Sequence, residues 1–232
     1  MIEILLSTYN GDRFLDQQLE SIFLQTYTNW KIIIRDDGSS DNTLDIIKKW
    51  KNLFPDKISH YEDGESRLGA SKSFSKLLEN SSAPYVMLCD QDDFWYSNKV
   101  EISFLKLKCV ENLYGSDIPL MVCTDLEVVD ENLKVLSESF WKDRKDDPRI
   151  LQDFEKLIAH SVVTGNTILM NHSAVNVSTP ILTDFFLHDQ WISIKVAKFG
   201  KIFFIDQPLV KYRQHYNNVL GSFKTNKIYL LN

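Results

Sequence analysis

Residues 85–93 contain an apolar run that ends in three carboxylates, Tyr85-Val86-Met87-Leu88-Cys89-Asp90-Gln91-Asp92-Asp93. A short apolar run followed by polar residues indicates a buried strand that ends in a loop. The same pattern occurs earlier in the chain, where residues 2–7 lead into a polar loop at 8–12 and residues 31–35 lead into another at 36–41. A further short strand is predicted at 57–61.

Helices are predicted between these strands, because apolar residues recur there at helical spacing. They are expected from about residue 14 and at 43–50, 71–78 and 98–110. The alternation predicts an α/β fold, with a mostly parallel sheet, helices on both faces and ligands at the carboxyl ends of the strands.

The second half is less regular. A strand is predicted at 120–129, a solvated charged loop at 142–147, a helix at 151–160, a strand at 167–170, a helix after Asp189 and a β-like run at 201–212. We expect this half to form a small region on the acceptor side.

Composition limits the class of protein. The chain has 232 residues, 44% hydrophobic and 25% charged, as expected for one ordinary globular domain. A net charge of -6 argues against a nucleic-acid partner, which usually requires a basic surface. The three cysteines form no CxxC pair, which favours a reducing compartment and buried thiols.

No signal peptide and no apolar run of about 20 residues is found, so we expect a cytoplasmic protein. Peripheral contact with the inner face of the cell membrane remains open.

Carboxylates follow two of the predicted strands. Asp37 could accept hydrogen bonds from a base or a ribose, although Asp-Gly is also a common turn dipeptide. Arg67 could contact the nucleotide or be an ordinary surface arginine.

Asp90, Asp92 and Asp93 would repel one another unless a cation compensates them, and oxygen ligands with open positions suit Mg²⁺ or Mn²⁺. Helix capping by Asp92 or Asp93 is the alternative.

Two motifs of the second half complete the candidate site. In His188-Asp189-Gln190-Trp191, Asp189 could accept the proton of an attacking hydroxyl, or could cap a helix, and the Trp191 ring could stack on a sugar. In Tyr212-Arg213-Gln214-His215, Arg213 and His215 could supply positive charge for a diphosphate or a metal ligand, although a lone histidine is more often a surface residue.

These motifs together resemble the inverting glycosyltransferase family 2. The resemblance is carried, over residues 2–221, by Ser7-Thr8-Tyr9-Asn10, Gln25-Thr26-Tyr27-Thr28-Asn29-Trp30, Asp36-Asp37-Gly38-Ser39, Asp90-Gln91-Asp92-Asp93 with Trp95, and His188-Asp189-Gln190-Trp191.

The resemblance implies a GT-A (Rossmann-like) fold and a role for each motif. The expected donor-binding residues are Thr8, Tyr9, Asn10, Asp37, Arg67, Asp90 and Gln91. We expect Asp92 and His215 at the metal, Arg213 at the diphosphate and Asp189 as the catalytic base. His188, Trp191 and Gly165 are expected on the acceptor side.

Within that family, the Asp-Gln-Asp-Asp-x-Trp form, the His-Asp pair and the run at 212–221 are most similar to bacterial rhamnosyltransferases of cell-surface polysaccharide assembly. This implies dTDP-L-rhamnose as donor and a saccharide or lipid-linked saccharide as acceptor. Gln190 departs from the pattern, because an aromatic residue is frequent there, and this weakens the donor assignment.

The expected organisation is one GT-A domain over 1–221, with a nucleotide-sugar half at 1–115 and an acceptor half at 116–221. A tail at 222–232 would follow, and we expect relatives to continue beyond the position of Asn232. The competing interpretations are a metal-dependent phosphotransferase or phosphatase, and a non-catalytic nucleotide-sugar-binding module.

Overall fold

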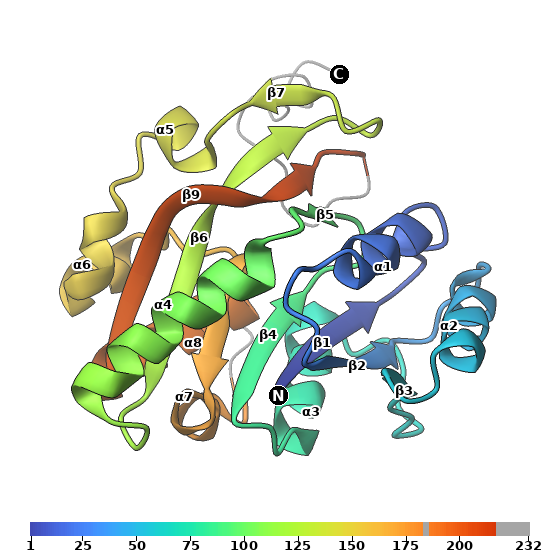
Figure 1. The fold of residues 1–232 in the computed structure, drawn as a ribbon, viewed down its shortest axis with the longest axis horizontal. Helices are drawn as coiled ribbons and strands as arrows, with labels where there is room; N and C mark the ends of the chain where they lie inside the picture. The colour runs from blue at the N-terminus through green and yellow to red at the C-terminus, as the bar shows by residue number, and fades with distance from the viewer. Residues whose placement is uncertain (183–185, 217–232) are drawn as a thin grey trace.

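The computed structural model describes residues 1–182 and 186–216 (Figure 1). Within these residues nine strands form one sheet in the order β3-β2-β1-β4-β8-β6-β9-β5, and β7 pairs with β6. The strands are β1 (Ile2–Thr8), β2 (Trp30–Asp36), β3 (Ile58–His60), β4 (Tyr85–Cys89), β5 (Phe94–Trp95), β6 (Leu120–Val129), β7 (Val135–Ser137), β8 (Leu169–Asn171) and β9 (Lys201–Arg213). The helices are α1 (Leu15–Phe23), α2 (Thr43–Leu53), α3 (Ala70–Asn80), α4 (Lys99–Tyr114), α5 (Phe140–Arg144), α6 (Phe154–Ala159), α7 (His172–Ser178) and α8 (His188–Phe199), with 3-10 turns η1 (Pro148–Gln152) and η2 (Gly165–Thr167).

The first four strands form the parallel half of the sheet, as predicted. β1 pairs in parallel with β2 on one side and with β4 on the other. Leu6 lies opposite Cys89, and Thr8 lies opposite Asp36, so the loops that follow β1, β2 and β4 leave the sheet at the same edge.

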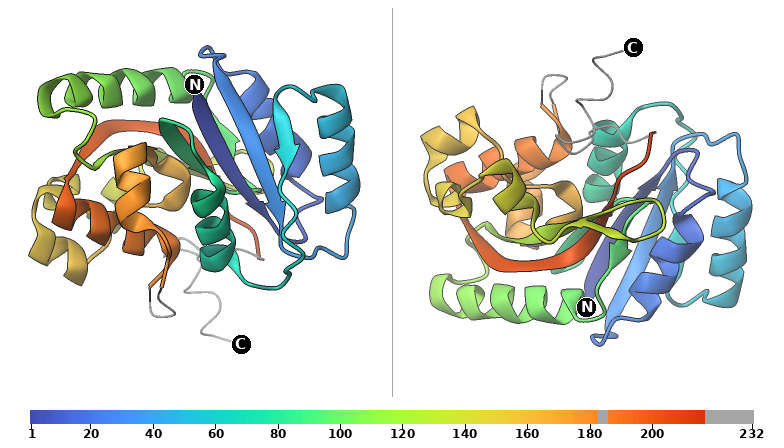
Figure 2. Two further views of the ribbon diagram at one scale, coloured as in Figure 1. Left: turned by 90° about the horizontal axis from the view of Figure 1, so that it is seen from below. Right: turned by 90° about the horizontal axis from the view of Figure 1, so that it is seen from above.

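Helices cover both faces of this sheet. α1 and α4 lie on one face, and α3, α7 and α8 lie on the other (Figure 2). The chain moves outward from β1 to β2 and β3, and then returns through α3 to β4 on the other side of β1. Such a reversal of strand order creates a crevice at the carboxyl ends of the strands, where α/β proteins bind ligands.

The second half of the sheet is mixed. β8 runs antiparallel to β4 and β6, whereas β9 runs parallel to β6. The short elements β5, β7 and α7 were not predicted. The charged stretch at 142–147 is a helix at its start and not wholly a loop, because α5 buries Phe140 and Trp141 and Ser139 Oγ accepts a hydrogen bond from the Lys142 amide.

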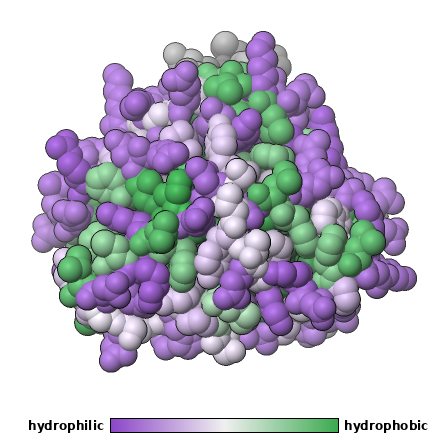
Figure 3. Space-filling model, in the orientation of Figure 1, coloured by the Kyte–Doolittle hydropathy of each residue, from purple (hydrophilic) through white to green (hydrophobic). Residues whose placement is uncertain are grey.

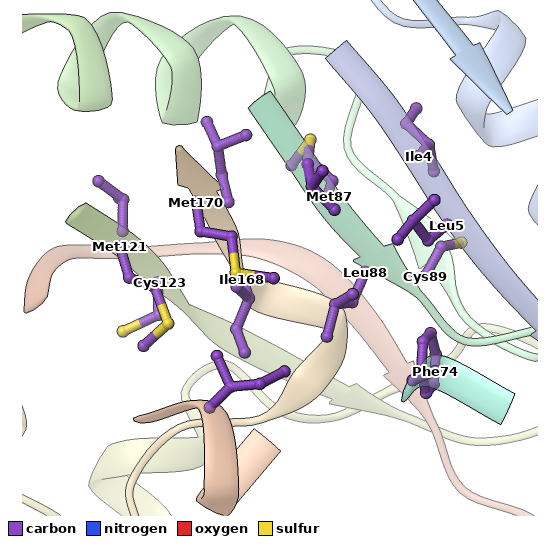
Figure 4. Packing of buried hydrophobic residues seen from close by; sticks show 14 of the residues in the cluster. Ile4, Leu5, Phe74, Met87, Leu88, Cys89, Met121, Cys123, Ile168 and Met170 are labelled. Carbon is purple, nitrogen blue, oxygen red and sulfur yellow. The ribbon is translucent and has the colours of Figure 1, made fainter. Parts of the chain in front are cut away.

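One hydrophobic core joins the two halves. Buried side chains of neighbouring strands pack together, among them Leu5 of β1, Leu88 of β4 and Met170 of β8 (Figure 4). Cys89 and Cys123 belong to this core as predicted, but Cys109 is exposed on the outer side of α4. Its position on the helix surface corrects the expectation that all three thiols are buried.

The surface is mixed in character. Hydrophobic residues lie in separate areas among hydrophilic ones on the face shown in Figure 3, and isolated exposed apolar side chains are normal for a soluble surface. Within residues 1–182 and 186–216, no helix combines the length and the apolar character needed to span a bilayer.

Candidate active site

The loop after β1 is held by side chains of the loop after β2. Thr8 is buried and donates its hydroxyl hydrogen to Asp36 at 2.9 Å. Asn10 has a φ of 47°, in the left-handed region that asparagine tolerates, and its side-chain oxygen accepts a hydrogen bond from the Ser40 amide at 2.8 Å. Tyr9 remains exposed at the rim. A ligand at the sheet edge would therefore meet the Tyr9 ring on a fixed loop.

Asp37 is a buried, ionised carboxylate. Burial alone would raise its pKa, but hydrogen bonds from Arg35 at 2.9 Å and from the Leu68 and Gly69 amides at 2.9 and 2.8 Å lower it. Asp37 thus fixes the segment before α3, in addition to any contact with a ligand. Arg67 is exposed in this segment, and its amide donates to the Asp37 carbonyl at 2.8 Å.

Gln91 joins the loops after β1 and β4. Its side-chain oxygen accepts a hydrogen bond from the Tyr9 amide at 2.9 Å, and its side-chain nitrogen donates to the Tyr9 carbonyl at 3.0 Å. The amide of Gln91 therefore pairs with the backbone of Tyr9 as a neighbouring strand would. This pairing keeps the two predicted donor loops in one fixed arrangement.

Negative charge is concentrated beside this pair. The pKa of Asp90 is raised to about 8, because burial disfavours its charge and because Asp92 and Asp189 repel it. The repulsion requires that the three carboxylates lie close together, although Asp189 comes from the other half of the chain. The predicted base therefore shares one region with the acidic loop.

Asp92 contacts His215 in this acidic region. Asp92 Oδ2 lies 2.9 Å from His215 Nε2, and the His215 ring packs against Phe14 with centroids 5.0 Å apart. Two ligands in adjacent positions, each about 2.1 Å from one Mg²⁺, lie about 3 Å apart. The pair therefore fits such an ion. Among the described residues no group of three or more acidic, histidine or cysteine side chains forms a metal cluster, so the remaining positions would fall to water and ligand oxygens.

Arg213 holds the acidic loop from the protein side. It is 1% exposed, and its guanidinium donates to the Asp92 carbonyl at 2.7 Å, to Gln17 Oε1 at 2.8 Å and to the Glu131 carbonyl. These donors face protein oxygens in a buried position, and the expected contact of Arg213 with a diphosphate stays a prediction. The geometry makes Arg213 a positioning residue for Asp92.

Asp93 lies behind the loop and is completely buried. Asp93 Oδ1 accepts a hydrogen bond from the Arg213 amide at 3.0 Å, and Oδ2 accepts one from Asn166. Burial and the charges of Asp92 and Asp90 raise the pKa of Asp93. Neither Asp92 nor Asp93 caps a helix, since α4 begins only at Lys99, and the capping alternative is wrong.

The acceptor side is organised around the start of α8. Asp189 lies in the first turn, beyond the N-cap Leu187, and its Oδ1 accepts a hydrogen bond from the Gln190 amide at 2.7 Å. The His188 ring stacks on Phe74 with centroids 4.3 Å apart. A Cβ on Gly165 would lie 2.5 Å from His188 Nε2, so only glycine fits there without displacing His188.

His188 and Trp191 both pack inside the protein, and their expected contacts with an acceptor stay predictions. Both ring nitrogens of His188 are buried, and neither has a hydrogen-bond partner among the described residues. Burial lowers its pKa, which keeps the imidazole neutral. Trp191 donates from Nε1 to the Ser178 carbonyl at 2.8 Å and so packs α8 on α7. Residues two apart on a helix do not face the same way, which places Trp191 away from Asp189.

Four further residues of the site were not identified from the sequence: Arg35, Phe74, Lys99 and Asn166. Arg35 was treated only as part of its strand. A charged residue at the end of the apolar run 32–34, directly before two aspartates, is an available signal for a buried ion pair. Phe74 and Asn166 have no local signal, because their contacts are made far along the chain, and Lys99 looks like an exposed residue at a helix start.

The architecture is that of GT-A glycosyltransferases. A solved mannosyltransferase, PcManGT from Pyrobaculum calidifontis in complex with GDP-Man and Mn²⁺, superimposes with a TM-score of 0.69 and 16% identity, over 94% of this chain and 58% of that one. At this identity the likeness shows the fold, and the GT-A prediction is confirmed.

Sequence comparison gives a family match for the first part of the chain. Residues 3–108 match the Glycosyl transferase family 2 model. It is 25% identical over 227 residues to the dTDP-rhamnosyl transferase RfbG of Shigella flexneri, covering 94% of this chain and 74% of that protein. It is 30% identical over 119 residues to the Escherichia coli UDP-Glc:alpha-D-GlcNAc-diphosphoundecaprenol beta-1,3-glucosyltransferase WfgD, covering 50% of this chain and 45% of that protein. The chain thus spans about three quarters of the first relative and less than half of the second.

Proposed function

We propose that the chain is a metal-dependent inverting glycosyltransferase that transfers L-rhamnose from dTDP-L-rhamnose to a hydroxyl of a saccharide or lipid-linked saccharide. The observation that carries this proposal is the meeting of Asp92, His215 and the charge of Asp189 at one edge of the sheet. A donor diphosphate requires a cation, and an acceptor hydroxyl requires a base. The cation at Asp92 and His215 and the base Asp189 would lie side by side.

In this mechanism Asp189 accepts the proton of the acceptor hydroxyl as its oxygen attacks the anomeric carbon. Attack opposite the departing nucleoside diphosphate inverts that carbon, and no covalent intermediate with the protein is needed. A divalent cation held by Asp92 and His215 would neutralise the charge that develops on the leaving diphosphate. Tyr9, Asp37 and Gln91 hold the nucleoside end of the donor.

The identity of donor and acceptor is supported by relatives. RfbG is named for dTDP-rhamnosyl transfer, and its match extends over most of this chain. WfgD is named for a diphosphoundecaprenol acceptor, which supports a lipid-linked substrate at a membrane surface. PcManGT was solved with a nucleotide sugar and Mn²⁺, in agreement with a divalent cation.

The proposal is tested by donor binding and transfer. We expect dTDP-L-rhamnose with Mn²⁺ to raise the melting temperature more than UDP-glucose or GDP-mannose does, because selective binding stabilises the folded state. Chelation should remove both the shift and the transfer. Stabilisation by another nucleotide sugar alone would overturn the donor assignment, and equal turnover with chelator would overturn the metal.

The base is tested by Asp189→Asn, with Asp56→Asn on an exposed loop as the matched control. We expect kcat to fall by about 10²–10⁴ in Asp189→Asn, the range typical of a lost general base, while the donor Kd changes by less than about threefold. The control should retain wild-type values. A parallel loss of donor affinity would make Asp189 a binding residue instead.

A further inference from the structure

A completely buried arginine lies near the end of β2, two residues before Asp37. Arg35 is 0% exposed, and each of the five N–H donors of its side chain makes a hydrogen bond. The acceptors are Asp63 at 2.9 and 3.2 Å, Asp37 at 2.9 Å, Ser73 Oγ at 2.8 Å and the Glu65 carbonyl at 3.0 Å. With every donor engaged inside the protein, Arg35 can influence a ligand only through its neighbours.

Arg35 joins two carboxylates from different parts of the chain. Asp37 follows β2, whereas Asp63 begins the connecting segment, residues 63–69, which leads from β3 to α3. The side chains of Arg35, Asp37 and Asp63 are 1%, 5% and 10% exposed. A buried ion pair adds little net stability, because its desolvation offsets its attraction, but the planar fork of an arginine binds a carboxylate in one orientation. The contribution of Arg35 is therefore mainly to geometry.

The connecting segment is held at both of its ends by this group. At its start, Arg35 donates to both carboxylate oxygens of Asp63. At its other end, the Leu68 and Gly69 amides donate to the two oxygens of Asp37 at 2.9 and 2.8 Å. Because Arg35 also donates to Asp37, one side chain connects the two ends.

The middle of the connecting segment is also constrained. Arg67 has a φ of 58°, which is unfavourable for a residue other than glycine and persists only where the surrounding structure holds it. Ser66 packs closely on the turn after β2, since a Cβ on Gly38 would lie 2.7 Å from Ser66 Cβ. The exposed side chain of Arg67 is thus carried by a backbone that depends on its contacts for its conformation.

We propose that Arg35 is a positioning residue for the donor nucleoside. By tying Asp63 to Asp37, it fixes the connecting segment and the Asp37 carboxylate in the arrangement that receives the nucleoside. The inference rests on the proposed function in one respect, since it takes Asp37 and Arg67 as donor-binding residues. Arg35 itself does not touch the donor.

The test variant is Asp63→Asn, which breaks the Asp63 end of the connection and leaves Arg35 paired with Asp37. Arg35 donates to both oxygens of Asp63, so the amide nitrogen of an asparagine would face one of these donors and lose that bond. The matched control is Glu62→Gln. It removes the same charge one position earlier, from a side chain that is 77% exposed.

Hydrogen exchange without metal or nucleotide measures the connecting segment directly. We expect the amides of Leu68 and Gly69 to exchange at least about tenfold faster in Asp63→Asn than in the wild type, while those of α4 change by less than about twofold. Glu62→Gln should match the wild type in both places. Unchanged exchange at Leu68 and Gly69, or an equal increase in α4, would overturn the proposal.

Nucleotide affinity measures the consequence for the donor, with dTDP as the probe and Mn²⁺ at saturation in calorimetry. We expect the Kd for dTDP to rise at least about tenfold in Asp63→Asn, equivalent to about 1.4 kcal/mol, and to stay within about twofold in Glu62→Gln. The sign is informative, because loss of a negative charge would by itself strengthen the binding of an anionic nucleotide. Unchanged or tighter binding of dTDP by Asp63→Asn would overturn the proposal.

Mn²⁺ affinity without nucleotide is the second control on the same variant. It should stay within about twofold of the wild type, because Asp92 and His215 lie on other loops, and a matching loss of Mn²⁺ affinity would show general disruption and overturn the proposal. Absence of dTDP binding to the wild-type protein would refute the donor in the proposed function, whereas hydrogen exchange would still decide the role of Arg35.

Discussion

Replacement of Arg213 by lysine distinguishes a residue that holds the acidic loop from one that binds the donor. From a buried position the guanidinium donates hydrogen bonds to the Asp92 carbonyl, to Gln17 Oε1 and to the Glu131 carbonyl. A lysine keeps the positive charge but reaches at most one of these oxygens, because it lacks the planar fork of donors. Arg213→Lys therefore leaves two buried acceptors unsatisfied.

The magnitude follows from those two bonds. A hydrogen bond to a charged group contributes about 1.5–3 kcal/mol, and breaking a buried charged contact costs about 3–5 kcal/mol. We expect the free energy of unfolding to fall by about 3–5 kcal/mol. Solvent screening does not reduce this figure much, because Arg213 is only 1% exposed.

Urea unfolding at neutral pH measures this change through the midpoint and the m-value. Arg149→Lys is a suitable control, since its side chain is 80% exposed and pairs with Asp147, and it should change stability by less than about 0.5 kcal/mol. The reasoning about Arg213 is refuted if Arg213→Lys is as stable as the wild type and shows only a raised donor KM. That result would restore the diphosphate contact suggested by the sequence.

Three further results are expected. His215→Ala should weaken Mn²⁺ binding at least tenfold in calorimetry, and unaltered affinity would remove His215 from the ligands. Asp37→Asn should lower the free energy of unfolding by about 1–3 kcal/mol at pH 7. Because the pKa of Asp37 is lowered in the folded state, its contribution to stability is present above the unfolded pKa of about 3.9 and is lost as the pH falls through the folded pKa. A loss that is equal at pH 7 and pH 3 in urea unfolding would contradict this. Gly165→Ala should cost about 1–3 kcal/mol and lower kcat, because its Cβ would lie 2.5 Å from His188 Nε2; a wild-type melting temperature would show that His188 can move aside.

The parallel half of the fold was predictable because three of its strands, β1, β2 and β4, each contain a run of apolar residues. Such runs, separated by amphipathic helices, allow few arrangements other than a sheet covered on both faces. The mixed part of the sheet was less predictable because several of its elements are short. β5 has two residues and β7 has three, too few to show a period, and the expected helix at 151–160 divides at Asp153 into η1 and α6.

The roles of site residues were predictable where the residue type alone indicates the chemistry. They were not predictable where the burial of the side chain decides the role. Asp92 and His215 are metal-ligand types at the ends of strand-like runs, and they lie 2.9 Å apart. Arg213 has an equally suitable type for a diphosphate, but the end of β9 directs it into the protein. Lys99 looks like an exposed residue at a helix start, and only the packing of Trp95 above it reveals its burial.

Incomplete compensation of charge gives the site its expected affinity for a cation. Asp90, Asp92, Asp93 and Asp189 bring four carboxyl groups into one region, and Arg213 donates to the Asp92 carbonyl and, from its amide, to Asp93. Burial, and after it the charges of Asp92 and Asp189, raise the pKa of Asp90 to about 8. We expect a bound divalent cation to compensate the negative charge that remains. An added positive charge beside this loop should therefore weaken cation binding, and loss of Arg213 should destabilise the loop.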